Sequence, residues 1–437
     1  MQTLAAIIIF VAAYIAIATE KISKTVVAVL GASLMLILHL VSFEEAMHAV
    51  DLNVIFLLVG MMTCAHILSK TGFFEWVAIS VAKIARGNPF MIMLLLLSVT
   101  AGISAFIDNV TTIILLVPLT ILIAELLEIN PVPFLILEAL ASNIGGTATL
   151  IGDPPNIIIG SQAKLSFNDF LMNLTPVVII VFIAFILSVY VIFRGKFSVN
   201  RTVRERVINA IPHLAIIDKK NMIKSLFILA LILAGFFLQG VLHVEPGVIA
   251  LAGSMLMILF CKSDSDETLM KVEWGVIFFF IGMFMMIAGL EANGVITKAG
   301  EMILSITSKN LFAVCLVVLF GSALFSAFLD NIPFVITMVP MIKNFITHFA
   351  GVMGVTDPAI IQTHIAQPLW WALALGACLG GNATIIGASA NVIMVRISER
   401  NKYHISFGKF FSYGVPFTLQ ALIICGFYIW WRYFLNQ

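Results

Sequence analysis

Long apolar segments, each separated from the next by a few polar residues, run along the whole chain. In the first half these segments cover residues 3–19, 25–41, 53–69, 89–127, 131–160 and 175–193. A similar series returns from about residue 221 to the C-terminus. Because a membrane-spanning helix needs about 20 consecutive apolar residues, this pattern predicts a bundle of transmembrane helices.

The segment 89–127 is a double one, because its two apolar arms are joined by only two polar residues, Asp108 and Asn109. Each arm is short for a full span, and no exposed loop fits between them. We therefore expect a re-entrant helical hairpin with its tip at mid-depth, in preference to two full spans. Such backbone is tolerated in a membrane where protein buries it or where it lines a wet cavity. The segment 310–348 repeats the pattern around Asp330 and Asn331.

Two further apolar segments, 131–160 and 366–395, are interrupted by small and polar residues. The first contains NIGGTATLIGDPPN from Asn143, and the second contains CLGGNATIIGASAN from Cys378. Glycine pairs allow the backbone to unwind, and prolines prevent the helix from resuming early. We expect a broken helix in each half.

The two halves of the chain are copies of one unit. SAFIDNVTTIILLVP from Ser104 matches SAFLDNIPFVITMVP from Ser326 at eight of fifteen positions, 222 residues further on. After an insertion of thirteen residues the two interrupted segments also match. We expect a first repeat at residues 1–193, a polar cytoplasmic linker at 194–221 and a second repeat at 222–437.

The basic residues predict the orientation. With five crossings in each half, 19 lysines and arginines fall on one side and five on the other. The basic side is expected to be cytoplasmic, which places both termini outside. An odd number of crossings also inverts the second repeat. The predicted fold is an all-α polytopic protein of the cell inner (plasma) membrane, with two inverted repeats, about ten transmembrane helices, two re-entrant hairpins and two interrupted helices.

Composition narrows the possible functions. Hydrophobic residues make up 61% of the chain, charged residues 11%, and the net charge is +1. These values exclude water-soluble classes and give no basic surface for nucleic acid. The sequence contains no HExxH, GxSG or Walker A motif, and the five cysteines have no metal spacing. We expect no enzyme activity, no metal and no cofactor, and any ATP hydrolysis would come from a separate ATPase subunit.

Inverted repeats with interrupted helices at matching positions point to the binding site of a secondary transporter. Threonine and asparagine supply neutral ligands, half-helix N-termini carry partial positive charge, and carboxyl groups at membrane depth are functional candidates. Asp153 occurs in the first half only, since its partner position is Ala388. The predicted substrate- and ion-binding residues are Asp108, Asn109, Thr111, Gly145, Gly146, Thr147, Thr149, Asp153, Asn156, Asp330, Asn331, Gly380, Gly381, Asn382, Thr384 and Asn391.

No lysine or arginine lies in the two tips or the two breaks, so the expected site is acidic or neutral. This favours protons, Na⁺ or a neutral polar solute over a multivalent anion. Some alternatives remain open. The tip aspartates could serve as helix caps, the glycines could serve in close helix packing, and Asp153 could lie in an interfacial turn. Glu138 is expected at the interface, and Cys378 is expected to be a packing thiol.

The segment SNIGGTATLIGDPPNIIIGS from Ser142 and the duplicated SAFxDN element resemble the ion transporter superfamily, in the branch of arsenite permeases, NhaD-type sodium/proton antiporters and the pigmentation P protein. This resemblance implies a scaffold and a transport domain, two opposed hairpins, a homodimer and elevator-like alternating access. Dicarboxylate carriers of the superfamily bear Ser-Asn-Thr motifs at the tips. The tips here begin Asp108-Asn109 and Asp330-Asn331, which departs from that pattern.

The expected function is proton-coupled efflux of arsenite, antimonite or a similar small oxyacid by a secondary active transporter. Sodium/proton antiport is the alternative, with Na⁺ in place of H⁺ as coupling ion, and a dicarboxylate or citrate carrier is less favoured. The expected partners are the lipid bilayer, a small inorganic solute or ion, and a second copy of the chain.

Overall fold

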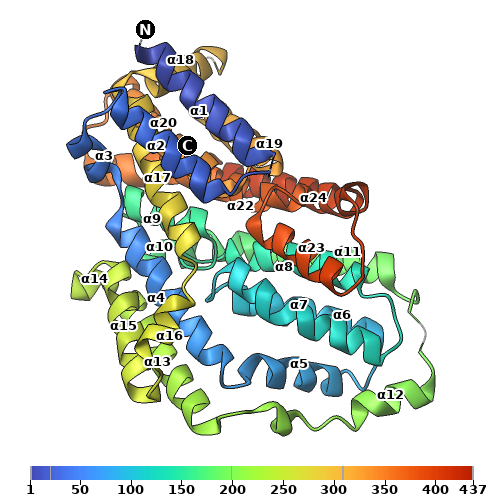
Figure 1. Cartoon of the computed structure of the whole chain (residues 1–437). Helices are drawn as coiled ribbons and strands as arrows, with labels where there is room; N and C mark the ends of the chain where they lie inside the picture. Colours follow the sequence, from blue (N-terminus) through green and yellow to red (C-terminus); the bar gives the residue numbers. More distant parts are fainter. Residues whose placement is uncertain (1, 20, 198, 308–309, 436–437) are drawn as a thin grey trace.

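The computed structural model describes residues 2–19, 21–197, 199–307 and 310–435, and every regular element in these ranges is a helix. Eight helices are long and apolar enough to cross a membrane, and five shorter apolar helices accompany them. The predicted all-helical polytopic membrane class is therefore confirmed. The helices form two groups. In Figure 1 most helices of the first group run steeply, and most helices of the second run crosswise at the centre and right, while residues 311–353 of the second group lie at the top beside the first.

The first group is called here the framework bundle. It consists of α1 (Gln2–Ala18), α2 (Lys24–Ile37), α4 (Leu52–Ser69), α13 (Lys219–Phe237), α15 (Pro246–Cys261) and α17 (Trp274–Ala292). Two close crossings hold it together. Gly60 of α4 faces the backbone of Ala250 in α15, and Gly282 of α17 faces the backbone of Ala28 in α2. The second pair is the repeat equivalent of the first, and in both pairs the lack of a side chain permits close backbone approach.

The second group is called the hairpin bundle. It consists of α6 (Pro89–Ser104), α7 (Asn109–Leu126), α8 (Val132–Gly146), α9 (Pro154–Ala163), α11 (Thr175–Phe193), α19 (Leu311–Phe328), α20 (Asn331–Met353), α22 (Gln367–Gly380), α23 (Ser389–Arg400) and α24 (Phe407–Tyr433). Helices α6 and α7 form hairpin 1, and α19 and α20 form hairpin 2. The second arm of hairpin 2 continues beyond the predicted limit of 348, and α23 continues beyond 395.

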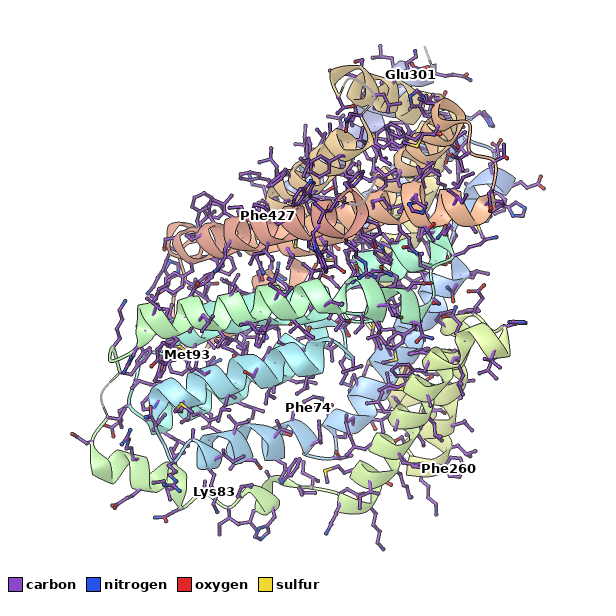
Figure 2. The ribbon with its side chains drawn as sticks, turned by 180° about the vertical axis from the view of Figure 1, so that it is seen from behind. Phe74, Lys83, Met93, Phe260, Glu301 and Phe427 are labelled. Atoms are coloured by element: carbon purple, nitrogen blue, oxygen red, sulfur yellow. The ribbon has the colours of Figure 1, made fainter. Side chains whose placement is uncertain are left out.

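Amphipathic helices connect the two bundles. Helix α5 (Phe73–Ile84) joins α4 to hairpin 1, and α18 (Val295–Ile306) joins α17 to hairpin 2. Phe74 of α5 packs against Leu116 of hairpin 1, and Lys83 at the other end of α5 lies beside the linker between the repeats (Figure 2).

That linker contains two short helices, α12 (Arg201–Ile208) and η1 (Pro212–Ala215), and α13 begins within its predicted range. The boundaries of the two repeats stay a prediction. The remaining short helices are α3 (Phe43–Ala49), α10 (Phe167–Asn173), α14 (Gln239–Leu242), α16 (Ser265–Met270), α21 (Pro358–Ile360), η2 (Ile361–Ala366) and η3 (Gly381–Ala383).

Candidate functional site

Each hairpin tip is hydrogen-bonded to the unwound segment of its own half. In the first half, helix α8 ends at Gly146 and α9 begins at Pro154. The Thr149 hydroxyl in the gap donates to the backbone carbonyl of Ala105, next to the tip of hairpin 1. The equivalent hydroxyl of the second half, that of Thr384, donates to the carbonyl of Ala327. The predicted breaks and tips are therefore structurally coupled.

Asparagine side chains stabilise the unwound backbone in the same way in both halves. The Asn156 amide donates to the carbonyls of Thr147 and Thr149 at 3.1 and 2.9 Å. The Asn391 amide donates to the carbonyls of Gly381 and Thr384 at 2.8 and 2.9 Å. These bonds satisfy carbonyl groups that the broken helix leaves without an intrahelical partner.

A second set of side-chain bonds joins the two halves. The Asn143 amide donates to Asn382 Oδ1 at 2.9 Å and to Asn391 Oδ1 at 3.0 Å. Asn143 also accepts a bond of 3.0 Å from the amide of Asn109 at the tip of hairpin 1. All four side chains are buried. The tips and breaks predicted to converge thus form one polar core inside the hairpin bundle.

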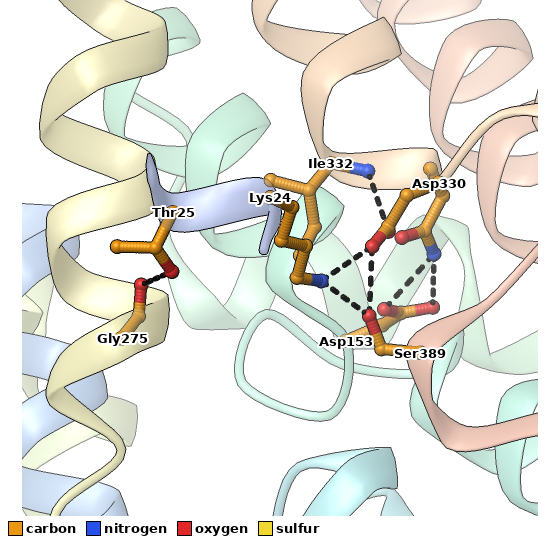
Figure 3. Close-up of polar contacts among 8 residues, drawn as sticks. Lys24, Thr25, Asp153, Gly275, Asp330, Ile332 and Ser389 are labelled. Atoms are coloured by element: carbon orange, nitrogen blue, oxygen red, sulfur yellow. Dashed lines mark hydrogen bonds and ion pairs between the residues drawn. The ribbon is translucent and has the colours of Figure 1, made fainter. Parts of the chain in front are cut away.

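Asp153 is the carboxyl group of this core and is completely buried. The Asn331 amide at the tip of hairpin 2 donates to its two oxygens at 3.3 and 3.4 Å (Figure 3). The Cys378 thiol and the Asn109 side chain also interact with it. Within the described part of the chain, Asp153 makes no ion pair. Asp153 is therefore inside the protein, and its depth in the membrane stays a prediction.

Cys378 occupies the position in the second half that Asn143 occupies in the first. Its thiol donates to Asn156 Oδ1 at 3.5 Å, as Asn143 donates to Asn391. The thiol is therefore part of the hydrogen-bonded core as well as a packing group. The role of the residue was missed because cysteine in an apolar helix is usually a packing residue.

The four predicted glycines serve close backbone contacts. A Cβ atom on Gly145 would meet the backbone of Ala101, and one on Gly380 would meet that of Ala323. Gly146 and Gly381 face the backbone of the unwound segments, at Gly152 and Gly387 respectively. Gly145 and Gly380 thus serve in close helix packing, which was one of the alternatives from the sequence. Gly146 and Gly381 instead allow the unwound segment to fold back against the end of its own helix.

The carboxyl groups of the two tip aspartates have different hydrogen-bond partners. Asp108 caps α7, because its oxygens accept from the Thr111 backbone N–H at 2.9 Å and from the Thr111 hydroxyl at 2.6 Å. Asp330 caps α20 through the Ile332 N–H at 3.5 Å. Asp330 also pairs with Lys24 at 2.6 Å. The capping alternative is thus correct for both residues, and Asp330 has a second role.

A cavity of about 410 Å³ lies beside the polar core, between the two bundles. Of the predicted residues, Asp108 and Asp330 line it, and so does Pro154, the neighbour of Asp153. The other charged residues of its wall are Lys24, Glu273 and Arg396. The two tips and the two breaks contain no lysine or arginine, but the cavity beside them is lined by one of each. Lys24 was missed because it begins an apolar segment about 300 residues before Asp330.

Glu138, which the sequence predicts at the interface, is covered by protein. It is 1% exposed, and its depth in the membrane stays a prediction. The Thr100 hydroxyl donates to Glu138 Oε1 at 3.2 Å, and among the described residues Oε2 has no partner. The residue lies on α8 against both arms of hairpin 1 and away from the cavity lining.

Comparison with known proteins gives consistent matches along the chain. Residues 14–376 match a family model described as citrate transporter, CitMHS. An uncharacterized transporter of Mycobacterium tuberculosis is 40% identical over 99% of both chains. An uncharacterized transporter of Synechocystis is 30% identical over 98% of this chain and 97% of its own. The P protein of Mus musculus is 30% identical over 97% of this chain and 59% of its own length.

Proposed function

The chain belongs to the citrate transporter (CitMHS) family of membrane transporters, and on this premise we propose that it is a secondary active transporter in which Asp153 binds the coupling proton. The observation that carries the proposal is the environment of this carboxyl group. It is completely buried, its partners are neutral, and the described residues give it no ion pair. A buried carboxylate without a cation costs several kcal/mol, and binding a proton removes that cost.

The same environment favours H⁺ over Na⁺ as coupling ion. Hard cations are bound by oxygen ligands. Asp153 faces an amide N–H of Asn331 and the thiol of Cys378. These groups suit a carboxyl group that gains and loses a proton better than they suit a cage for a metal cation.

The cavity wall favours a small uncharged or weakly acidic solute. Three carboxyl groups, those of Asp108, Glu273 and Asp330, face two basic side chains across about 410 Å³. One of the basic residues, Lys24, is paired with Asp330. A multiply charged anion would meet excess negative charge here. Neutral arsenous acid or a similar oxyacid, exported in exchange for protons, is the substrate class that we propose.

Citrate is the second candidate, and two observations favour it. The family model that matches the chain is described as a citrate transporter, and Lys24 and Arg396 line the cavity. For citrate to bind, Lys24 would have to leave Asp330 and pair with a carboxylate group of citrate.

Sodium/proton antiport is the third candidate and rests on the three carboxyl groups that line the cavity.

The test is uptake into proteoliposomes that contain the purified protein. Arsenite, citrate and radiolabelled sodium are offered separately, each with and without an imposed pH gradient. The proposal predicts that arsenite accumulates against its own gradient only when the pH gradient is present. Gradient-driven accumulation of citrate alone would establish the second candidate. Transport of any solute at a rate indifferent to the pH gradient would contradict coupling to protons.

A further inference from the structure

We propose that Lys24 determines the orientation in which the empty transporter rests. Its ion pair with Asp330 holds the hairpin bundle against the framework bundle in the arrangement seen here, and the pair must open before the bundles can change their relative position. This inference rests on the proposed function, because a transporter exposes its site alternately to the two sides of the membrane.

The contact is a closed triangle that bridges the bundles. Lys24 Nζ lies 2.6 Å from Asp330 Oδ2 and 2.8 Å from Ser389 Oγ, and the Ser389 hydroxyl donates to Asp330 at 2.7 Å (Figure 3). Lys24 is the first residue of α2 in the framework bundle. Asp330 caps α20, and Ser389 is the first residue of α23. The Lys24 ammonium group therefore joins hairpin 2 and the second interrupted helix to the framework, in addition to the bond of 3.1 Å between the hydroxyls of Tyr14 in α1 and Thr337 in α20.

The framework positions the ammonium group. The neighbouring Thr25 hydroxyl donates to the carbonyl of Gly275 at 2.7 Å, which fixes the start of α2 on α17 (Figure 3). Lys24 Nζ also lies 5.0 Å from the ring centroid of Phe279 in α17, a distance at which a cation–π attraction operates. The lysine thus belongs structurally to the framework and reaches across to the hairpin bundle.

Among the described residues, the tip of hairpin 1 makes no equivalent ion pair with the framework, and three differences between the repeats explain why. The position equivalent to Lys24 is Pro246, which carries no charge, and the position equivalent to Ser389 is Pro154. Thr111, which satisfies Asp108 from within hairpin 1, is replaced by Pro333 in hairpin 2. All three differences affect the same contact. Asp108 is hydrogen-bonded by its own helix, whereas Asp330 accepts bonds from Ile332 and Ser389 and also from Lys24 of the framework.

This asymmetry makes the contact one-sided. If the hairpin bundle moves so that the tip of hairpin 1 approaches the framework, Asp108 meets no lysine at the position of Pro246. The ion pair therefore stabilises only one of the two orientations. A ligand or contact shifts a two-state equilibrium by its differential interaction with the two states, so Lys24 biases the empty protein toward the orientation described here.

A second lysine–carboxylate pair offers a matched control. Lys70 and Glu267 are also 2.6 Å apart, but their side chains are 43% and 56% exposed, against 29% and 10% for Lys24 and Asp330. Lys70 lowers the pKa of Glu267 through this hydrogen bond. The pair joins the end of α4 to α16, which packs on α4, and does not bridge the bundles. Exposed pairs contribute little free energy, and breaking this one leaves the relative position of the bundles unchanged.

The experiment measures orientation directly, without substrate or pH gradient. Val392 lines the cavity on α23, and the five native cysteines are buried. A Val392→Cys protein is reconstituted in vesicles of known orientation and labelled with an impermeant maleimide from each side of the membrane in turn. The parent protein without Val392→Cys gives the blank. Lys24→Met should lower the labelling rate from the side that labels faster in the protein with Lys24 at least about tenfold relative to the rate from the other side, as expected when an ion pair that favours one state is lost.

Three further variants make the result decisive. Lys70→Met should label at the parental rate. The exchange of charges in Lys24→Asp/Asp330→Lys should restore much of the lost labelling. Ser389→Ala keeps the ion pair but removes the hydroxyl. It should change the labelling rate in the same direction as Lys24→Met but by a smaller factor, and it replaces Lys24→Met in the test if that variant does not fold.

Parental labelling in a folded Lys24→Met or Ser389→Ala protein would overturn the inference. Because no transport is measured, that outcome is independent of which solute or coupling ion the protein uses.

Discussion

At the scale of single residues, Glu138 shows how burial can depend on contacts that the local sequence does not reveal. A glutamate seven residues from the start of an apolar segment resembles an interfacial residue, yet its helix α8 packs against both arms of hairpin 1 and the side chain is buried. The covering residues lie up to 38 positions away along the chain. No periodicity around Glu138 itself predicts them.

The burial of Glu138 leads to a prediction about its replacement. Glu138→Gln keeps an acceptor for the Thr100 hydroxyl and removes a buried acid, so the free energy of unfolding should change by less than about 1 kcal/mol. Glu138→Lys buries an ammonium group without an acidic partner and should cost several kcal/mol. Thermal unfolding followed by size-exclusion chromatography measures both. Glu44→Lys, on the exposed face of α3, is the control, and equal stability of Glu138→Lys and Glu44→Lys would contradict the burial.

At the scale of elements, the sequence predicted where the helices of the two hairpins and of the two interrupted segments break, while the re-entry of the hairpins into the membrane stays a prediction. A polar pair between two short apolar arms, and glycine pairs followed by prolines, are local features, and local features determine where helices begin and end. Helix α6 ends at Ser104, four residues before the predicted tip, and α7 begins at Asn109, the second residue of that tip. The extension of hairpin 2 to Met353 was not predicted, because His348 and Gly351 read as the end of an apolar segment.

The unwound segments give a prediction at this scale. A Cβ atom on Gly146 would lie 2.5 Å from the carbonyl oxygen of Gly152. Gly146→Ala should therefore force the backbone of the break apart and cost about 1–3 kcal/mol. Gly321→Ala in α19 is the matched control, since its Cβ would meet nothing within 4 Å, and the better helix propensity of alanine should stabilise it slightly. Equal melting temperatures for the two variants would show that the break tolerates a side chain.

At the scale of the whole molecule, the repeat indicated which residues are equivalent, but it could not show which of them touch. The bond from Asn143 to Asn391 joins residues 248 positions apart, and the pair of Lys24 with Asp330 joins residues 306 positions apart. Both contacts arise from the docking of one half on the other. That docking is decided by packing over the entire interface, which no pattern within a segment encodes.

The predicted inversion of the repeats can be tested by labelling. Lys83 lies at the end of α5 before hairpin 1, and Val352 lies in the last turn of hairpin 2; both are exposed. If the hairpins enter from opposite sides, Lys83→Cys should react with an impermeant maleimide only from the cytoplasmic side and Val352→Cys only from outside. The buried native cysteines leave a low background. Reaction of both cysteines from the same side would refute the inversion.

The central claim of this account is that Asp153 binds the proton that drives transport. The most direct measurement is solute accumulation driven by a pH gradient in proteoliposomes containing Asp153→Asn. Asparagine is close to aspartate in size and cannot exchange a proton at neutral pH, so the core should remain folded. The control is Asp357→Asn, which changes an exposed helix cap. The account predicts that Asp357→Asn accumulates solute as the parent does, whereas Asp153→Asn equilibrates it without accumulation at any gradient. Accumulation at the parental level by Asp153→Asn would contradict the account.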